Sequence, residues 1–274
     1  MEITTPSTPS TTLITCYYKV KSKHTFEEYT RWIINLLLTI RCNIIIFTSA
    51  EQANWINSLA LYNRSYPEPD AHLGCVKVII KELQELDIVK RYPDIWEDQY
   101  RKDPTRNIRT KECYMIWNSK LALVRHAIIL NPFGSDKFIW NDIGSLRDFR
   151  FIHENYMHII QYPRYENISS GKIDIVLIED FNIPDQIIFQ NETHLSGAIF
   201  GGDRNAFFKL IDLFYQNFDM YLENGYFIGC DQQILATCFQ QTPELFNLIT
   251  PDYSNQIIDK WFYLYYHYSQ PQNQ

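Results

Sequence analysis

The segment from Phe138 to Gly144, which reads FIWNDIG, ends an apolar stretch in a carboxylate and is the chain's strongest candidate for chemistry. A divalent cation held by Asp142 could bridge the two phosphates of a nucleotide-diphosphate sugar and stabilise the departing diphosphate. Asn141 could hydrogen-bond a ribose hydroxyl, and Gly144 permits close approach of the ligand. The alternative is an Asx turn in which Asp142 caps the next helix.

Two basic residues are candidates for binding phosphate. Lys120 would act as a point charge, and the planar guanidinium of Arg147 would act as a fork. For either residue taken singly, a surface ion pair is the alternative.

Two further segments combine glycine with a carboxylate. Gly201-Gly202-Asp203 lies between an expected strand and an expected helix, where it could form an acceptor-binding loop, or Asp203 could be an ordinary N-cap. In the segment GCDQQ at 229–233, Asp231 either caps a helix or points into a cleft to orient or deprotonate an acceptor hydroxyl. Gln232 beside it is a second acceptor-side candidate.

His267 lies in the aromatic run Trp261–Tyr268. It could return to the site as a metal ligand, because histidine is the commonest metal-binding side chain, or it could simply be packed among the rings. The sequence contains no P-loop, no GxGxxG and no Ser-His-Asp elbow, and no cysteine has a catalytic signature.

Composition narrows the class of protein. The 274 residues are 46% hydrophobic and 21% charged, which is typical of a globular fold with a real core. The net charge is −7 and no Lys/Arg cluster resembles a nucleic-acid stripe, so duplex binding is set aside. Six widely spaced cysteines without a CxxC pair indicate free thiols in a reducing compartment. With no secretory segment and no apolar stretch long enough to span a bilayer, we expect a cytoplasmic protein.

The order of elements predicts an α/β fold. Residues 1–12 are rich in Thr, Ser and Pro and are expected to be a disordered tail. Strands then alternate with helices up to residue 142, and the uninterrupted apolar run Ile44–Phe47 predicts a strand buried on both faces. Short strands at 173–178 and 196–200 and helices at 204–222 and 231–240 follow. We therefore predict a Rossmann-like, mostly parallel sheet with a mixed α+β C-terminal half, in a single domain over 13–268.

Capping patterns mark the first two helices of this order. Thr25 and Glu28 form a capping-box pattern before the first helix, and Ser49 and Gln52 form the same pattern before the second. In sheets of this kind, ligands bind beyond the carboxyl ends of the strands. The rule selects residues at the ends of expected strands: Tyr17, Tyr18, Thr48, Ser49, Asn141 and Asp142.

Several of these segments occur in an order that resembles the bacterial HtrL/YibB and WlaTC group of glycosyltransferase-like proteins. The resemblance covers nearly all of residues 13–266 and rests on Ile14–Tyr18, Phe47–Ser49, Trp140–Gly144, Gly201-Gly202 and Asp231-Gln232. More broadly, the chain resembles the GT-A superfamily, which uses a DxD-type motif, Mn²⁺ or Mg²⁺, and a UDP-sugar donor.

The resemblance implies roles for particular residues. Asp142 matches the last, metal-binding position of the DxD-type motif, although Trp140 and Asn141 stand at its first two positions. Tyr17 and Thr48 would line the nucleotide pocket, and Asp231 would be an acceptor-side or catalytic carboxylate. The C-terminal histidine that usually completes the metal site would be His267.

We therefore expect transfer of a sugar from a nucleotide-diphosphate sugar, a UDP-sugar above all, to a hydroxyl of a glycan, lipid or protein. One alternative is sugar nucleotidyl transfer, against which we count the lack of a Gly-rich, Lys/Arg-bearing loop after the first strand. Another is a non-catalytic carbohydrate-binding or scaffold protein on a degenerate transferase fold, which the incomplete DxD motif leaves open.

Overall fold

The structure is a computed structural model that describes residues 10–64, 73–147, 162–183, 186–252 and 259–271. Its strands are β1 (Thr11–Tyr17), β2 (Asn43–Thr48), β3 (Val76–Ile80), β4 (Lys137–Asn141), β5 (Ile173–Leu177), β6 (Leu195–Asp203) and β7 (Phe246–Ile249). Its helices are α1 (Phe26–Thr39), α2 (Ala50–Arg64), α3 (Asp87–Arg91), α4 (Trp96–Lys102), α5 (Lys111–Leu130), α7 (Arg204–Glu223), α8 (Asp231–Gln241) and α9 (Leu264–Ser269).

The strands form a seven-stranded sheet in the order β3-β2-β1-β4-β6-β5-β7. Four of the neighbouring pairs are parallel, and only the two pairs that include β6 are antiparallel. Among these strands β6 alone is therefore reversed. The fold is α/β with a mostly parallel sheet, as predicted.

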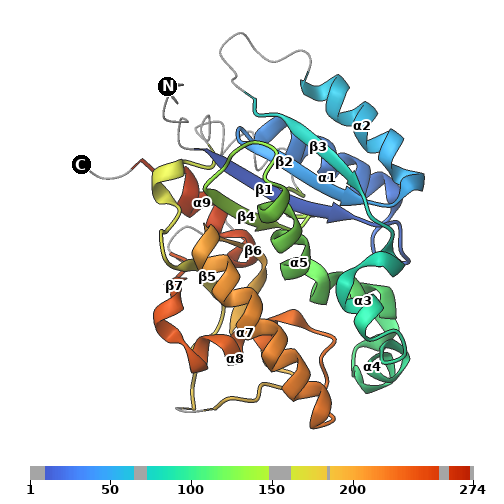
Figure 1. The fold of residues 1–274 in the computed structure, drawn as a ribbon, viewed down its shortest axis with the longest axis vertical. Helices are drawn as coiled ribbons and strands as arrows, with labels where there is room; N and C mark the ends of the chain where they lie inside the picture. The colour runs from blue at the N-terminus through green and yellow to red at the C-terminus, as the bar shows by residue number, and fades with distance from the viewer. Residues whose placement is uncertain (1–9, 65–72, 148–161, 184–185, 253–258, 272–274) are drawn as a thin grey trace, which may run out of the picture.

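Two cores lie on opposite faces of the sheet, because successive side chains of a strand point to opposite sides. Leu13 belongs to the same core as Ile33 of α1 on one face, whereas the next residue, Ile14, belongs to the same core as Leu123 of α5 on the other. Figure 1 shows the sheet between its two helical layers. Residues Ile44–Phe47 of β2 are fully buried, which confirms the prediction that this strand is covered on both faces.

Local capping explains where the first helices begin. The predicted capping box of α1 is present: Glu28 N donates to Thr25 Oγ1 at 3.2 Å, and Thr25 N donates to Glu28 Oε2 at 2.8 Å. Ser49 directly precedes α2, and its carbonyl oxygen accepts from Gln52 N and Ala53 N at 3.1 Å. Ala50 N donates to Glu82 Oε1 at 2.7 Å, so a carboxylate from the segment after β3 also contacts this helix start.

The start of the sheet also differs from the prediction. The composition predicts that Thr11 and Thr12 belong to a disordered tail, but they are the first residues of β1 and pair with Lys137 and Asn43, respectively. Threonine is β-branched and suits a strand that has partners on both sides. Residues 1–9 lie outside the described residues.

Candidate functional site

Two adjoining cavities open at the carboxyl ends of β1 and β4. The Asp231 cavity has a volume of about 270 Å³, and the Tyr17 cavity has a volume of about 320 Å³. They share a common wall of four lining residues: Arg109, Trp117, Asp142 and Arg147. The two cavities together are a candidate site for a ligand made of two parts.

Four elements deliver the central side chains of this site. Asp142 follows the last residue of β4, and its backbone N donates to Ala198 O at 2.8 Å. Gly197 comes from the start of β6, Asp231 is the first residue of α8, and Lys120 lies at mid-length in α5. Because β6 runs antiparallel to β4, its beginning meets the end of β4, and this reversal brings Gly197 to the site.

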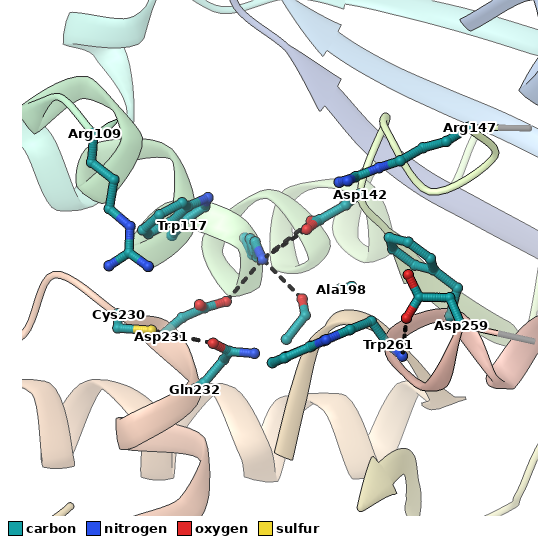
Figure 2. Close-up of a pocket in the computed structure, with 13 residues that line it drawn as sticks. Arg109, Trp117, Asp142, Arg147, Ala198, Cys230, Asp231, Gln232, Asp259 and Trp261 are labelled. Carbon is teal, nitrogen blue, oxygen red and sulfur yellow. Dashed lines mark hydrogen bonds and ion pairs between the residues drawn. The ribbon is translucent and has the colours of Figure 1, made fainter. Parts of the chain in front are cut away.

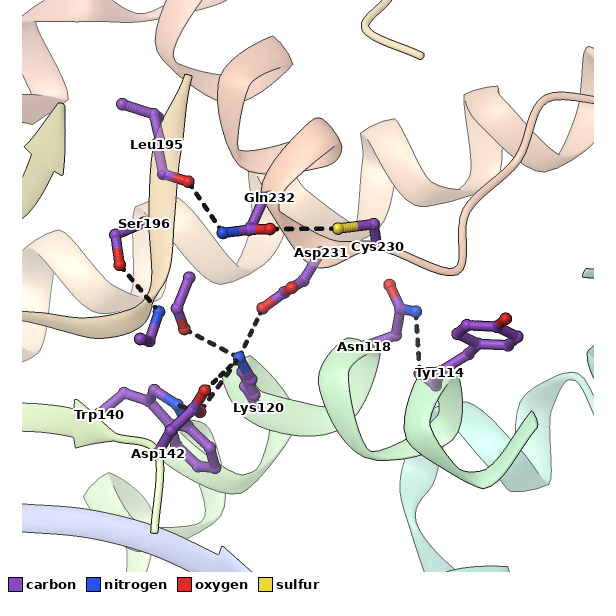
Figure 3. Close-up of polar contacts among 12 residues, drawn as sticks. Tyr114, Asn118, Lys120, Trp140, Asp142, Leu195, Ser196, Cys230, Asp231 and Gln232 are labelled. Carbon is purple, nitrogen blue, oxygen red and sulfur yellow. Dashed lines mark hydrogen bonds and ion pairs between the residues drawn. The ribbon is translucent and has the colours of Figure 1, made fainter. Parts of the chain in front are cut away.

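A buried ammonium group stands at the centre of the site (Figure 3). Lys120 Nζ lies 3.1 Å from Asp142 Oδ1 and 3.0 Å from Asp231 Oδ2, and it donates to Gly197 O at 2.8 Å. Asp142 Oδ2 also lies 3.4 Å away, so four oxygen atoms of three residues surround the ammonium group. The burial of Lys120 disfavours the predicted contact with phosphate, since the side chain is only 6% exposed and already has these partners.

The two carboxylates differ in their access to the cavities. The Asp142 side chain is 35% exposed, whereas that of Asp231 is 7% exposed. Trp140 Nε1 donates to Asp142 Oδ1 at 2.9 Å and fixes the orientation of this carboxylate. Asp142 can thus meet an incoming ligand, and Asp231 forms part of the floor of its cavity.

Burial and charge together set the ionisation of the buried pair. Burial raises the pKa of Asp231 above its ordinary value, Lys120 acts in the opposite direction, and Asp142 adds to the rise. Burial alone would lower the pKa of Lys120, but the two carboxylates outweigh it and the pKa lies above its usual range. Lys120 is therefore a permanent cation at neutral pH.

Asp231 does not have the capping role that the sequence left open. The N-cap of α8 is Cys230, so Asp231 is already inside the helix and its side chain is directed at Lys120. Burial raises the pKa of the Cys230 thiol to about 12, which makes a thiolate nucleophile there unfavourable. Figure 2 shows Asp231 projecting from the start of α8 into the cavity.

Arg147 lies where the two cavities meet. Its guanidinium stands 5.1 Å from the ring centre of Trp32 and 5.3 Å from that of Phe262, and its Nε donates to Gly144 O at 2.7 Å. These contacts hold the side chain in place, as a phosphate-binding fork requires. Arg147 lines both cavities, as Asp142 does, and its phosphate-binding role stays a prediction.

The predicted nucleotide-pocket residues separate into one that lines a cavity and two that do not. Tyr17 lines the Tyr17 cavity. Thr48 is fully buried, and its Oγ1 donates to Tyr17 O at 2.7 Å. It therefore stabilises the backbone of Tyr17 without lining the cavity. Asn141 is fully buried as well. Its amide nitrogen donates to Ser145 Oγ at 2.8 Å, and its amide oxygen accepts from Tyr265 Oη at 2.6 Å. Asn141 holds the chain after β4 in place and has no access to a ribose.

Gly201 and Gly202 lie away from the site, contrary to the prediction of an acceptor loop. They pair with Ile139 and Phe138, near the beginning of β4, because β6 is reversed. Each allows close packing: a β-carbon on Gly201 would meet Tyr268 Oη at 2.5 Å, and one on Gly202 would meet Lys172 O at the same distance. Asp203 is the N-cap of α7, as the alternative reading proposed.

Gln232 lines the Asp231 cavity, but both ends of its amide are engaged. Its Nε2 donates to Leu195 O at 3.2 Å, and its Oε1 accepts from Cys230 Sγ at 3.3 Å. The side chain therefore links the start of α8 to β6, and its amide atoms are already hydrogen-bonded within the protein.

The structure does not bring His267 to Asp142. His267 is in α9 and lines neither cavity, and burial lowers its pKa below the ordinary value. Within the described ranges, no three His, Cys, Asp or Glu side chains form a group that could hold a metal ion. The residues described fit a divalent cation only through the exposed side of Asp142, as an ion that shares its coordination with ligand phosphates.

Several site residues were not found from the sequence. Arg109 and Trp117 stand together on the shared wall, with the guanidinium 5.2 Å from the indole ring centre. Trp261 and Gly197 line the Asp231 cavity. Spacing along α5 could have paired Trp117 with Lys120, since residues three apart share a helix face. We find no comparable signal for Gly197.

Comparison with known proteins assigns the chain to a family. The family described as "Bacterial protein of unknown function (HtrL_YibB)" matches residues 9–269. The chain belongs to the HtrL_YibB family. No curated protein matches the sequence significantly. The HtrL_YibB match spans both cavities and each element that supplies them.

One solved structure with detectable similarity is that of 4-diphosphocytidyl-2C-methyl-D-erythritol synthase from Anaerococcus prevotii. It is 12% identical, and the alignment covers 90% of this HtrL_YibB chain and 91% of the other, with a TM-score of 0.37. A score at this level transfers no activity to the chain. In the described part of the molecule, no helix has the length and apolar character needed to cross a membrane.

Proposed function

We propose that this HtrL_YibB protein is a transferase that uses a nucleotide-diphosphate sugar and moves the sugar to an acceptor hydroxyl. One observation carries the proposal. The half-exposed Asp142 faces both cavities, and the buried Asp231 faces only one of them, with Lys120 between the two carboxylates. This asymmetry supports a donor side at the Tyr17 cavity and an acceptor side at the Asp231 cavity.

The Tyr17 cavity is the better place for the nucleotide. Tyr17, Trp32 and Trp117 line it and offer aromatic surface for a base. The diphosphate would then lie at the shared wall, where Arg109 and Arg147 provide positive charge. The sugar would extend into the Asp231 cavity.

Asp231 would accept the proton of the attacking hydroxyl. A general base works best when its pKa approaches the working pH, and burial moves the pKa of Asp231 in that direction. Lys120 at 3.0 Å holds the carboxylate in position.

A divalent cation is part of this proposal. Lys120, Asp142 and Asp231 together carry a net negative charge, which repels a diphosphate, so that Arg109 and Arg147 alone do not neutralise the ligand. Mn²⁺ or Mg²⁺ on the exposed side of Asp142 would supply charge neutralisation for the leaving diphosphate. Asp142 is the described residue that would hold it.

Binding tests this proposal first. The experiment compares the melting temperature of the protein with UDP, GDP, CDP and their sugars, each with and without Mn²⁺, because a ligand of the folded state raises it by mass action. We expect the largest rise with one diphosphate and its sugars in the presence of Mn²⁺. No rise with any of them would count against a nucleotide site.

Sugar nucleotidyl transfer is a second candidate, which one observation favours. The loop after β1 is not Gly-rich, as expected, but it does carry Lys19, Lys21 and Lys23. Lys23 lines the Tyr17 cavity, where a cationic loop suits a triphosphate. This reaction would consume a nucleoside triphosphate and a sugar phosphate and release pyrophosphate, whereas glycosyl transfer releases a nucleoside diphosphate.

A further inference from the structure

The environment of the Lys120 ammonium has the composition of a cation site for a hard metal. Two carboxylate oxygens and one backbone carbonyl oxygen converge on a single point at 2.8–3.1 Å. Oxygen sets of this kind are what Mg²⁺ and Mn²⁺ select. In this chain the point is occupied by a side chain of the protein itself.

Burial strengthens this interpretation. Lys120 is buried, and a buried cation is tolerated only when its charge and hydrogen-bonding capacity are met. Removal of the ammonium would leave Asp142 and Asp231 facing each other without compensation. The backbone carbonyl of Gly197 would also lose its donor.

We propose that Lys120 is a built-in counter-ion that occupies an oxygen-lined cation site between Asp142 and Asp231 and thereby keeps free divalent metal out of it. Without substrate, the protein then binds metal weakly, through the outer side of Asp142 only. Loss of the ammonium converts the same three oxygens into a metal site. The inference deepens the proposed function, because it states how the site is organised before a diphosphate arrives.

Three variants test this with Mn²⁺ alone as the probe. Lys120→Met removes the charge and keeps much of the apolar stem, Lys120→Arg retains the charge, and Lys120→Met combined with Asp231→Asn removes one carboxylate as well. Direct titration of each protein, with free Mn²⁺ followed by electron paramagnetic resonance, gives the affinity.

We expect Lys120→Met to bind Mn²⁺ about tenfold or more tightly than the wild type, since the charge of the ligand set governs affinity. Lys120→Arg should bind as weakly as the wild type, and the double variant should lose most of the gain. A folded Lys120→Met with wild-type Mn²⁺ affinity would overturn the proposal. So would a double variant that binds as tightly as Lys120→Met.

Lys120→Met also has a stability readout in case it folds poorly. Mn²⁺ should raise its melting temperature, or restore its folding, more than it does for Lys120→Arg. Failure of Mn²⁺ to do either would contradict the proposal. These measurements use no nucleotide and no sugar, so they stand whether or not the transferase activity is found.

Discussion

Gly197 and Asp231 lie so close together that a β-carbon on Gly197 would stand 2.8 Å from Asp231 Oδ2. The same atom would meet Gln232 Cγ at 3.0 Å. The beginning of β6 and the beginning of α8 are therefore in contact through a residue that must lack a side chain. The position of Asp231 depends on that contact.

Gly197→Ala should displace Asp231 and lower turnover. Overpacking of this kind costs about 1–3 kcal/mol of the free energy of unfolding, and a misplaced catalytic group about 10²-fold in rate. Gly171→Ala is the matched control, since Gly171 has φ +73° with nothing near its β-carbon position and its N–H donates to Asp203. The control should lose stability and keep its rate. Equal rates in both variants would show that Gly197 does not determine the position of Asp231.

Asp231→Asn should lower turnover by ~10² to 10⁴-fold, the usual loss for a general base, with nucleotide binding unchanged. The substitution preserves shape, and the N-cap of α8 is Cys230, so a capping effect cannot account for the loss. Nucleotide affinity and kcat, measured at matched melting temperatures, check this. Wild-type kcat in Asp231→Asn would make the residue structural.

The rate should depend on pH in a direction that the raised pKa of Asp231 determines. A base must be deprotonated, so kcat/KM should rise with pH through the pKa of Asp231 and fall away below it. An exposed aspartate has a pKa of about 3.9. Because burial places the pKa of Asp231 above its ordinary value, the rise in rate should occur at a higher pH than that. A pH profile of the wild type tests this; a rate that is already maximal at the pH where exposed aspartates ionise would contradict it.

UDP binding should require a divalent cation, and Asp142→Ala should abolish that requirement. The measurement is UDP affinity in Mn²⁺ and in EDTA for both proteins. Asp203→Asn is a control at the opposite edge of the sheet, where asparagine preserves the α7 cap. Unchanged UDP affinity of the wild type in EDTA would exclude a role for the metal in UDP binding.

Arg147→Lys should weaken UDP binding although it preserves the charge. Lysine lacks the planar fork and the stacking on Trp32 and Phe262, and a hydrogen bond to a charged group contributes about 1.5–3 kcal/mol, or roughly 10- to 100-fold in affinity. Arg91→Lys, at a surface ion pair with Asp219, is the control and should have no effect. Equal UDP affinity in Arg147→Lys and wild type would indicate that Arg147 only packs.

The sequence was informative wherever local chemistry determines local structure. The capping box at Thr25 and the apolar run of β2 depend on neighbouring residues, and both predictions are confirmed. The strand before Asp142 was found for the same reason. The rule that ligands bind at the carboxyl ends of strands then led to Tyr17 and Asp142, which do line the cavities.

Errors arose where a long-range pairing decides the outcome. The direction of β6 cannot be read from its own residues, and its reversal sends Gly201 to one edge of the sheet and Gly197 to the other. Asn141 is buried because Tyr265, 124 residues away, donates to it. Lys120 was recognised as a cation, but its partners on β6 and α8 become visible only in three dimensions.

The most direct test of the central claim is the identity of the product. The protein is incubated with Mn²⁺, a panel of nucleotide-diphosphate sugars and a mixture of acceptor glycans, and separately with nucleoside triphosphates and sugar phosphates. We predict release of a nucleoside diphosphate in the first mixture, lost in Asp231→Asn. Pyrophosphate from the second mixture, or no nucleotide product from either, would contradict glycosyl transfer.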